Sequence, residues 1–130
     1  MSPPRVLIVD DNLMNLELVS FLLQAADIDV SAASNADAAL RAIAEVAPDL
    51  ILMDIQLPDI DGLTLTRQIK ADPRTRATPV VALTAYAMKG DEARMLEAGC
   101  DGYIAKPIDV TSFASRVKAY LARRAASSSS

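Results

Sequence analysis

The chain has 130 residues, 52% of them hydrophobic and 23% charged, with a formal net charge of −4, which fits one globular domain and argues against a nucleic-acid-binding surface. It contains no histidine and one cysteine, Cys100, so it has no histidine-based catalytic triad, no histidine metal ligand and no internal disulfide. We expect Cys100 to be a small buried residue, and a single cysteine fits a reducing cytoplasm. No apolar run approaches the roughly 18 to 20 residues that span a bilayer, and the N-terminus has no secretory signal.

Strand and helix patterns alternate along the whole chain. Taken in order, they predict a strand at 5–9, a helix at 13–26, a strand at 28–33, a helix at 35–47, a strand at 49–53, a helix at 62–71, a strand at 79–84, a helix at 90–98, a strand at 102–105 and a helix at 109–124. Several strands are unbroken apolar runs, which is typical of parallel strands that are covered on both faces.

Capping residues mark several of the predicted helix ends. Ser34 or Asn35 can cap the helix at 35–47, and Asp109 can cap the last helix. Gly99 suits the position just after the helix at 90–98.

Five strand–helix units in a row predict an α/β fold. Their short connections require right-handed crossovers, which give a doubly wound, five-stranded parallel sheet of the flavodoxin-like (βα)₅ type with strand order 2-1-3-4-5. We expect one domain over residues 1–125 and a disordered, low-complexity tail at 126–130.

Two of the predicted strands run directly into carboxylates. Asp10 and Asp11 follow the first strand, and Asp54 closes the third. In this architecture ligands bind beyond the carboxyl ends of the strands where the winding reverses, here between the first and third strands. We therefore expect the three carboxylates to meet at one place.

Three clustered carboxylates need relief from their mutual repulsion. Two like charges about 4 Å apart repel by roughly 4 kcal/mol at an effective dielectric constant near 20. Protonation of one acid or a bound cation removes this repulsion. A site of hard oxygen ligands favours Mg²⁺ or Mn²⁺ over zinc. The plainer alternative is that Asp10 and Asp11 only cap the next helix and that Asp54 starts a turn.

The other two strand ends add complementary groups. Thr84 ends the fourth strand with a hydroxyl group, and Lys106 follows the fifth strand with a cation. With the carboxylates, they outline a phosphoryl-transfer site made of a metal, an acceptor carboxylate, a hydroxyl donor and a countercharge. An aspartate in such a site can act as the nucleophile and form an aspartyl phosphate.

With these motifs in view, the chain resembles the receiver domains of two-component response regulators, especially single-domain regulators of the DivK type. The resemblance covers the chain apart from its ends and rests on the stretches "VLIVDDNLMN", "PDLILMDIQLPDIDG" and "PVVALTAYAMKGDEARMLEAGCDGYIAKP" and on the terminal helix. It implies a protein of signal transduction that accepts a phosphoryl group and is not otherwise an enzyme.

The resemblance also implies a role for each residue of the site. Asp54 would be the phosphoacceptor, and Thr84 and Lys106 would hold the phosphoryl oxygens. Mg²⁺ would be bound directly by Asp11, Asp54 and the backbone carbonyl of Gln56, and largely through water by Asp10. A cis peptide bond is common at the position of Lys106–Pro107, and Pro58 and Gly62 suit the turn after Asp54.

The expected output is a change in protein–protein contacts. Tyr103 would turn inward when Thr84 is drawn toward the phosphoryl group, and Gln56 and Tyr86 would modulate dephosphorylation. The phosphodonor would be a histidine kinase or a histidine phosphotransfer protein, and the downstream partner an effector protein or kinase. We expect no nucleic-acid or membrane partner. The protein would be a monomer or a weak dimer through the helix at 90–98, the fifth strand and the last helix.

Three rival classes fit the sequence less well. A phosphatase of the haloacid-dehalogenase type needs an aspartate where this chain has Gln56. A flavin- or nucleotide-binding module would need a glycine-rich turn, and the four glycines do not form one. A transcription factor would need a further domain. A free switch, a phosphate sink or relay, and a receiver cut from a larger protein all remain open, because they share this site and differ only in partner. Asn12 and Asn15 resemble a form that is frequent in receivers attached to hybrid kinases, which leaves open whether the protein is free-standing.

Overall fold

The fold was determined as a computed structural model, which describes residues 3–85 and 89–128, with the side chains of 89–91 and 124–128 left out. Its strands are β1 (Arg5–Val9), β2 (Asp29–Ala33), β3 (Leu50–Asp54), β4 (Val80–Thr84) and β5 (Gly102–Ala105). They form one parallel sheet in the order β2-β1-β3-β4-β5, which confirms the predicted order. Each strand begins and ends within one residue of its predicted bounds.

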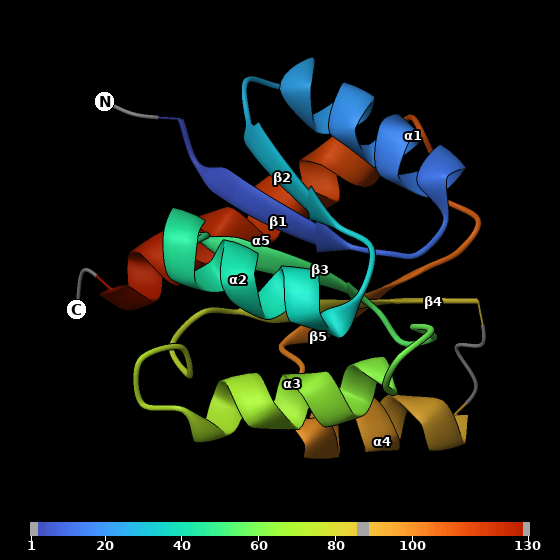
Figure 1. Ribbon diagram of the computed structural model, residues 1–130. Helices are drawn as coiled ribbons and strands as arrows, with labels where there is room; N and C mark the ends of the chain where they lie inside the picture. The colour runs from blue at the N-terminus through green and yellow to red at the C-terminus, as the bar shows by residue number, and fades with distance from the viewer. Residues whose placement is uncertain (1–2, 86–88, 129–130) are drawn as a thin grey trace.

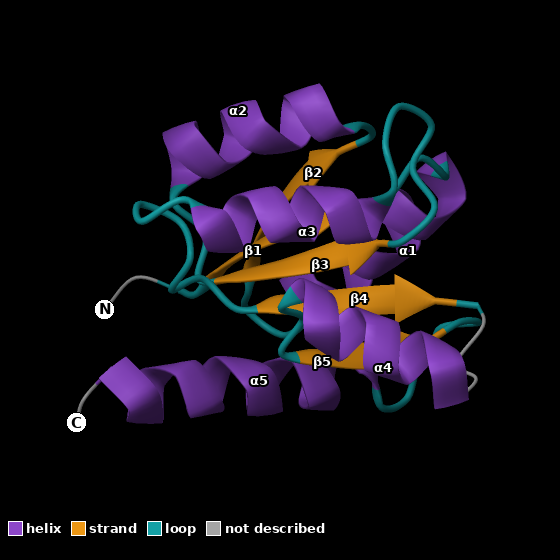
Figure 2. Cartoon of the chain, turned by 90° about the horizontal axis from the view of Figure 1, so that it is seen from below, coloured by secondary structure: helices purple, strands orange, loops and turns teal. Residues whose placement is uncertain are grey.

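Helices cover both faces of the sheet (Figures 1 and 2). The helices are α1 (Leu13–Gln24), α2 (Ala36–Val46), α3 (Gly62–Ala71), α4 (Lys89–Ala98) and α5 (Phe113–Ser128). α1 and α5 pack on one face, and α2, α3 and α4 on the other. Each face therefore buries its own apolar cluster, which explains why the strands are apolar without interruption.

Alternate strand residues divide between the two clusters, because successive side chains of a strand point to opposite faces. In β1, Leu7 and Val9 join the cluster under α2, α3 and α4, whereas Val6 and Ile8 join the cluster under α1 and α5. Phe113, the first residue of α5, is 1% exposed within the second cluster. The sheet that carries the site is thus held from both sides.

Two of the predicted helix-end residues, Asn35 and Gly99, agree with the structure, whereas Asp109 lies four residues before the first residue of α5. Asn35 is the N-cap of α2, and its side chain accepts a hydrogen bond from the amide of Ala38. Gly99, directly after α4, has a φ of +104°, and a Cβ there would press on the side chain of Lys70. This position therefore needs glycine.

The last helix differs from its prediction at both ends. The sequence placed its start at 109, but residues 109–112 form a separate turn in which Asp109 accepts hydrogen bonds from the amide and hydroxyl of Thr111. At the other end, α5 continues through residues 126–128, which we had expected to be disordered. Ala125 and Ala126 precede the serines that begin at Ser127, and they favour this extension because alanine is the strongest helix former.

Two further expectations concern burial and membranes. Cys100 is 5% exposed, and burial raises the pKa of its thiol, so it packs as a small apolar residue, as predicted. Within residues 3–85 and 89–128, no helix combines the length and the apolar character needed to cross a bilayer.

Candidate functional site

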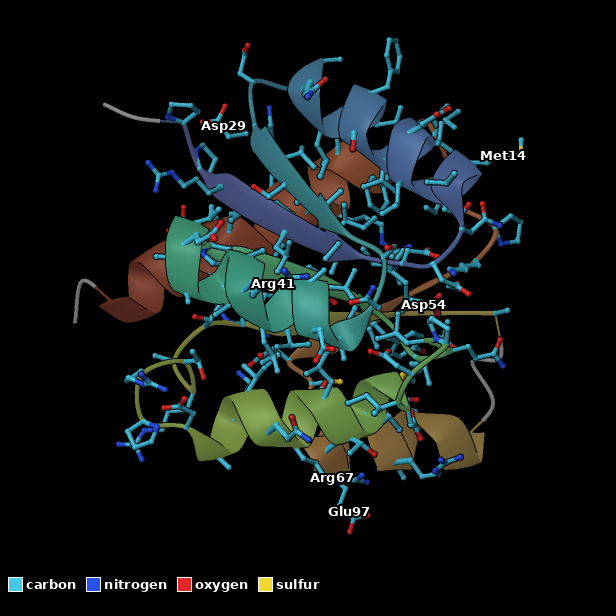
Figure 3. All side chains as sticks on the ribbon, viewed as in Figure 1. Met14, Asp29, Arg41, Asp54, Arg67 and Glu97 are labelled. Atoms are coloured by element: carbon cyan, nitrogen blue, oxygen red, sulfur yellow. The ribbon has the colours of Figure 1, made fainter. Side chains whose placement is uncertain are left out.

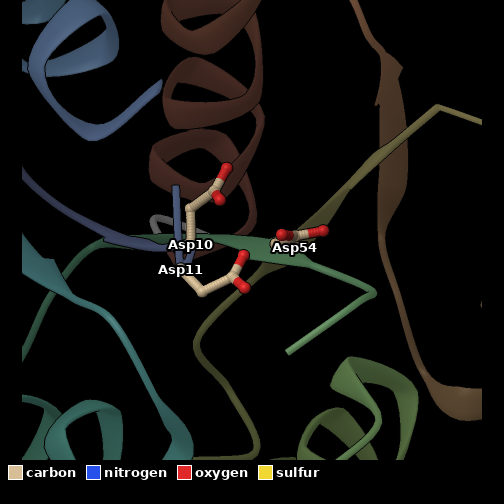
Figure 4. A group of neighbouring side chains, drawn as sticks. All are labelled: Asp10, Asp11 and Asp54. Carbon is tan, nitrogen blue, oxygen red and sulfur yellow. The ribbon is translucent and has the colours of Figure 1, made fainter. Parts of the chain in front are cut away.

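The three predicted carboxylates lie together at the carboxyl end of the sheet (Figure 4). Asp10 follows β1 and Asp54 ends β3, and these two strands pair with Val9 opposite Met53. One carboxylate oxygen from each of Asp10, Asp11 and Asp54 lies within 4.8 Å of the others. Asp10 and Asp54 are buried, and Asp11 is exposed. The structure thus brings together the acids that the strand ends predicted.

Hydrogen bonds fix the two buried carboxylates. Oδ1 of Asp10 accepts the amide of Asn12 at 2.9 Å, and Oδ1 of Asp54 accepts the amide of Gln56 at 3.0 Å. The N-cap of α1 is Asn12, whose side chain accepts the amides of Met14 and Asn15. Because Asn12 performs this capping, helix capping does not account for the cluster.

Lys106 places its ammonium group between the two buried acids. Its Nζ lies 3.2 Å from Oδ2 of Asp10 and 3.5 Å from Oδ2 of Asp54, and the side chain is 18% exposed. The Lys106 amide donates to the carbonyl of Thr84 at 2.7 Å, which joins the segment after β5 to the end of β4. The Lys106–Pro107 bond is cis, as expected.

The acidity of Asp54 reflects this setting. Burial raises the pKa of Asp54, and the nearby Asp10 raises it further, whereas the amide of Gln56 and the cation of Lys106 lower it. The net result is a pKa of about 6, above the ordinary value of 3.8. The carboxylate form is therefore held in the free protein at an energetic cost that a nearby positive charge can offset.

The cluster fits a hard divalent cation. Three carboxylates carry more negative charge than the single Lys106 neutralises, and all the candidate ligand atoms are oxygens. Such oxygen donors suit Mg²⁺ or Mn²⁺.

A cavity of about 670 Å³ adjoins the cluster. Asp54, Gln56, Thr84 and Lys106 line it, together with residues of α4 such as Arg94. Thr84 is 5% exposed and lines the same cavity as Asp54. Sequence reasoning did not include Arg94, because no strand end marks it.

Of the two tyrosines in the predicted set, the structure describes one. Tyr103, on β5, is half-buried and packs against the apolar cluster on the α2–α3–α4 face. Tyr86 lies outside the described residues.

The segment between β3 and α3, residues 55–61, is called the acceptor loop, after the role that the resemblance implies for Asp54. Gly62 follows it, and a Cβ at Gly62 would collide with the carbonyl of Asp54, so this position requires glycine for close approach rather than for a left-handed turn. Asp61 caps α3 through the amide of Leu63. Asp59 reaches across to α2 and accepts the amide of Ala36 with both oxygens, a contact that the sequence did not reveal.

Comparison with known proteins agrees with this geometry. The profile of the response regulator receiver domain matches residues 6–118. A curated relative, the polar-differentiation response regulator DivK of Brucella anthropi, is 46% identical over 119 residues, which are 92% of this chain and 97% of the relative. The protein of the same name from Brucella ovis is 46% identical over 116 residues, covering 89% and 94% of the two chains.

Solved structures show the same architecture. A putative response regulator from Chloroflexus aurantiacus is 35% identical, with a TM-score of 0.86 and coverage of 92% of this chain and 98% of that one. A CheY-like receiver domain protein from Methanospirillum hungatei is 28% identical, with a TM-score of 0.88 and coverage of 97% and 99%. The receiver domain of a histidine kinase from Syntrophus aciditrophicus is 34% identical, with a TM-score of 0.82 and coverage of 92% and 90%.

Proposed function

The chain belongs to the response regulator receiver domain family of two-component signalling, and from this premise we propose that it accepts a phosphoryl group on Asp54 from a phosphohistidine. The donor would be a sensor histidine kinase or a histidine phosphotransfer protein. It has to be another molecule, because this chain contains no histidine.

The observation that carries the proposal is the position of the Asp54 carboxylate. It stands at the carboxyl edge of the sheet with Oδ1 held by the amide of Gln56 and Oδ2 beside Lys106, and it lines the adjoining cavity. A carboxylate oxygen would attack phosphorus, the bond from phosphorus to the donor imidazole nitrogen would break, and an aspartyl phosphate would form. Such a transfer depends chiefly on positioning and on charge neutralisation.

The remaining site residues have complementary roles in this proposal. Asp11, Asp54 and the carbonyl of Gln56 would bind Mg²⁺ directly, with Asp10 acting largely through water, and Mn²⁺ could substitute. The bound cation would neutralise charge on the transferring group. Lys106 and the Thr84 hydroxyl would hold the phosphoryl oxygens.

The output of phosphorylation would be a change in binding to other proteins. Thr84 would move toward the phosphoryl group, and Tyr103 would turn inward from β5. The surface of α4, β5 and α5 would then change its affinity for an effector protein or kinase, or form a weak dimer. Gln56 and Tyr86 would set how long the aspartyl phosphate lasts. We expect this to take place in the cytoplasm.

Mass spectrometry after incubation with acetyl phosphate and Mg²⁺ tests the acceptor. We expect one added phosphoryl group in the parent protein and none in Asp54→Asn or in the presence of excess EDTA. Asp29→Asn is the matched control, because it makes the same chemical change at an exposed carboxylate of the edge strand β2, away from Asp54 (Figure 3). Full labelling of Asp54→Asn would contradict the assignment.

A second experiment separates the possible roles in a pathway. Affinity capture with the phosphorylated and unphosphorylated protein should recover a phosphorylation-dependent effector if the protein is a free switch. Recovery of kinases and phosphotransfer proteins alone, in both states, would identify a relay or phosphate sink.

A further inference from the structure

The side chain of Asp59 joins two parts of the molecule that are distant in sequence. It lies near the tip of the acceptor loop, and its Oδ1 and Oδ2 lie 3.1 Å and 3.0 Å from the amide nitrogen of Ala36, the first residue of α2. Partial desolvation raises the pKa of Asp59, but hydrogen bonds from the amides of Ala36, Asp59, Ile60 and Asp37 together hold it below its ordinary value. The carboxylate is therefore charged at neutral pH and faces the positive end of a helix.

The base of the acceptor loop is held separately from its tip. The amide of Ile55 bonds to the carbonyl of Leu83 at 3.4 Å, and the carbonyl of Ile55 accepts the amide of Gly62 at 2.7 Å. Gln56 donates its amide to Asp54. None of these bonds involves residues 57–60. At the tip, Leu57 and Ile60 pack against the apolar cluster under α2, α3 and α4, and Asp59, three residues after Gln56, adds hydrogen bonds to the first residue of α2.

Capping of α2 alone does not explain the contact. The helix has its own N-cap, Asn35, whose side chain accepts the amide of Ala38 at 2.8 Å. A single N-cap of this kind is the usual arrangement at the start of a helix. Asp59 adds a second acceptor from a different segment, and what it adds is a fixed position for the loop.

We propose that Asp59 is a positioning residue of the metal site, which fixes the acceptor loop against α2 and so holds the Gln56 carbonyl in place for the cation. This inference rests on the proposed function, in which that carbonyl is a ligand. Residues that orient metal ligands from outside the site commonly change metal affinity by tenfold or more when they are replaced.

The contact must also respond to the cation. If the Asp59–Ala36 contact strengthens Mg²⁺ binding, then bound Mg²⁺ strengthens the contact by the same factor, because coupling between two equilibria is reciprocal. We therefore expect Mg²⁺ to slow hydrogen exchange at the amide of Ala36.

The test is Mg²⁺ titration of the full chain by calorimetry, with hydrogen exchange measured by NMR. We expect Asp59→Ala to raise the Kd for Mg²⁺ about tenfold and to abolish the effect of Mg²⁺ on exchange at Ala36. Asn35→Ala, which removes the other cap of the same helix, should leave the Kd within about twofold of the parent. Asp59→Asn removes the same charge as Asp59→Ala but keeps an acceptor oxygen, so its Kd should rise by no more than about threefold.

Each other result has a definite meaning. An unchanged Kd in Asp59→Ala overturns the proposal, and so does an equal loss in Asp59→Ala and Asn35→Ala, which would show that Asp59 only caps the helix. Equal losses of Mg²⁺ affinity in Asp59→Ala and Asp59→Asn would overturn it as well, because they would show that the charge of Asp59 acts, and not its hydrogen bonds. If Asp59→Ala does not fold, Asp59→Asn and Asn35→Ala still test the proposal, because a tenfold rise of the Kd for Mg²⁺ in either variant overturns it. If the parent itself does not bind Mg²⁺, the proposed function fails first.

Discussion

The Asp54 carboxylate combines burial with a close acidic neighbour, Asp10, and both raise its pKa. Because its pKa of about 6 exceeds the ordinary 3.8, the folded metal-free protein binds a proton there more tightly than the unfolded chain does. The contribution of Asp54 to the free energy of unfolding therefore falls as the pH rises from about 4 to about 6, and it stays at its lowest value above that range.

Replacing Asp54 with asparagine should stabilise the metal-free protein at pH 7.5 by about 2 kcal/mol. Repulsion between charges less than 5 Å apart amounts to roughly 3–4 kcal/mol per pair at an effective dielectric constant near 20, and the lost attraction to Lys106 offsets part of it. Urea unfolding at pH 5 and pH 7.5 in EDTA measures the effect, and the gain should shrink at pH 5. A larger gain at pH 5 than at pH 7.5 would show that the sign is wrong.

Lys106 is the cation that the structure places against the same acids. Lys106→Gln should cost about 2 kcal/mol in EDTA, because it leaves Asp10 and Asp54 buried without their ion pairs. Millimolar Mg²⁺ should reduce this loss, since a second cation can occupy the cluster. The measurement is urea unfolding with and without Mg²⁺, and Lys118→Gln, on the exposed surface of α5, is the control. A loss that Mg²⁺ leaves unchanged would argue against cation binding at the cluster.

Among the elements, the strands could be predicted more closely than the helix ends. Unbroken apolar runs such as 50–53 place β3 to within one residue, because a parallel strand covered on both faces is typically apolar throughout and ends at the first polar residues. The start of α5 was missed because the turn at 109–112 already has helix-like hydrogen bonds, from the amide of Phe113 to the carbonyl of Asp109. A local pattern does not distinguish such a turn from the helix that follows it.

The residue that ends α2 has a strained backbone conformation. Ala47, its C-cap, has φ 50° and ψ 66°, the left-handed conformation that disfavours residues with a Cβ. Ala47→Gly should therefore raise the free energy of unfolding by about 0.5–1 kcal/mol. Ala42→Gly, inside the same helix, should lower it by about 1 kcal/mol. Chemical denaturation measures both, and a loss at both positions would contradict the argument.

For the molecule as a whole, the strand order determined most of the candidate site in advance. Asp10, Asp11, Asp54, Thr84 and Lys106 all follow or end strands, and parallel strands bring those ends to one edge. The Asp59 contact could not be predicted in the same way. It joins residues 23 apart through a loop tip whose path depends on how α2 and α3 pack, and no sequence periodicity encodes that.

The proposed switch connects this edge to α4 and β5. Beryllofluoride with Mg²⁺, which mimics an aspartyl phosphate, should shift amide NMR resonances between residues 84 and 106 in the parent protein and not in Asp54→Asn. Moving a population from 1:99 to 99:1 requires about 5.5 kcal/mol of differential stabilisation. Hydrogen bonds to a charged group contribute about 1.5–3 kcal/mol each, so the contacts of Thr84 and Lys106 alone would reach this value only at the upper end of that range. We therefore expect resonances at positions between the two states, which move further when a partner protein binds. Unchanged resonances in the parent would show that the acceptor edge and the β5 surface are not coupled.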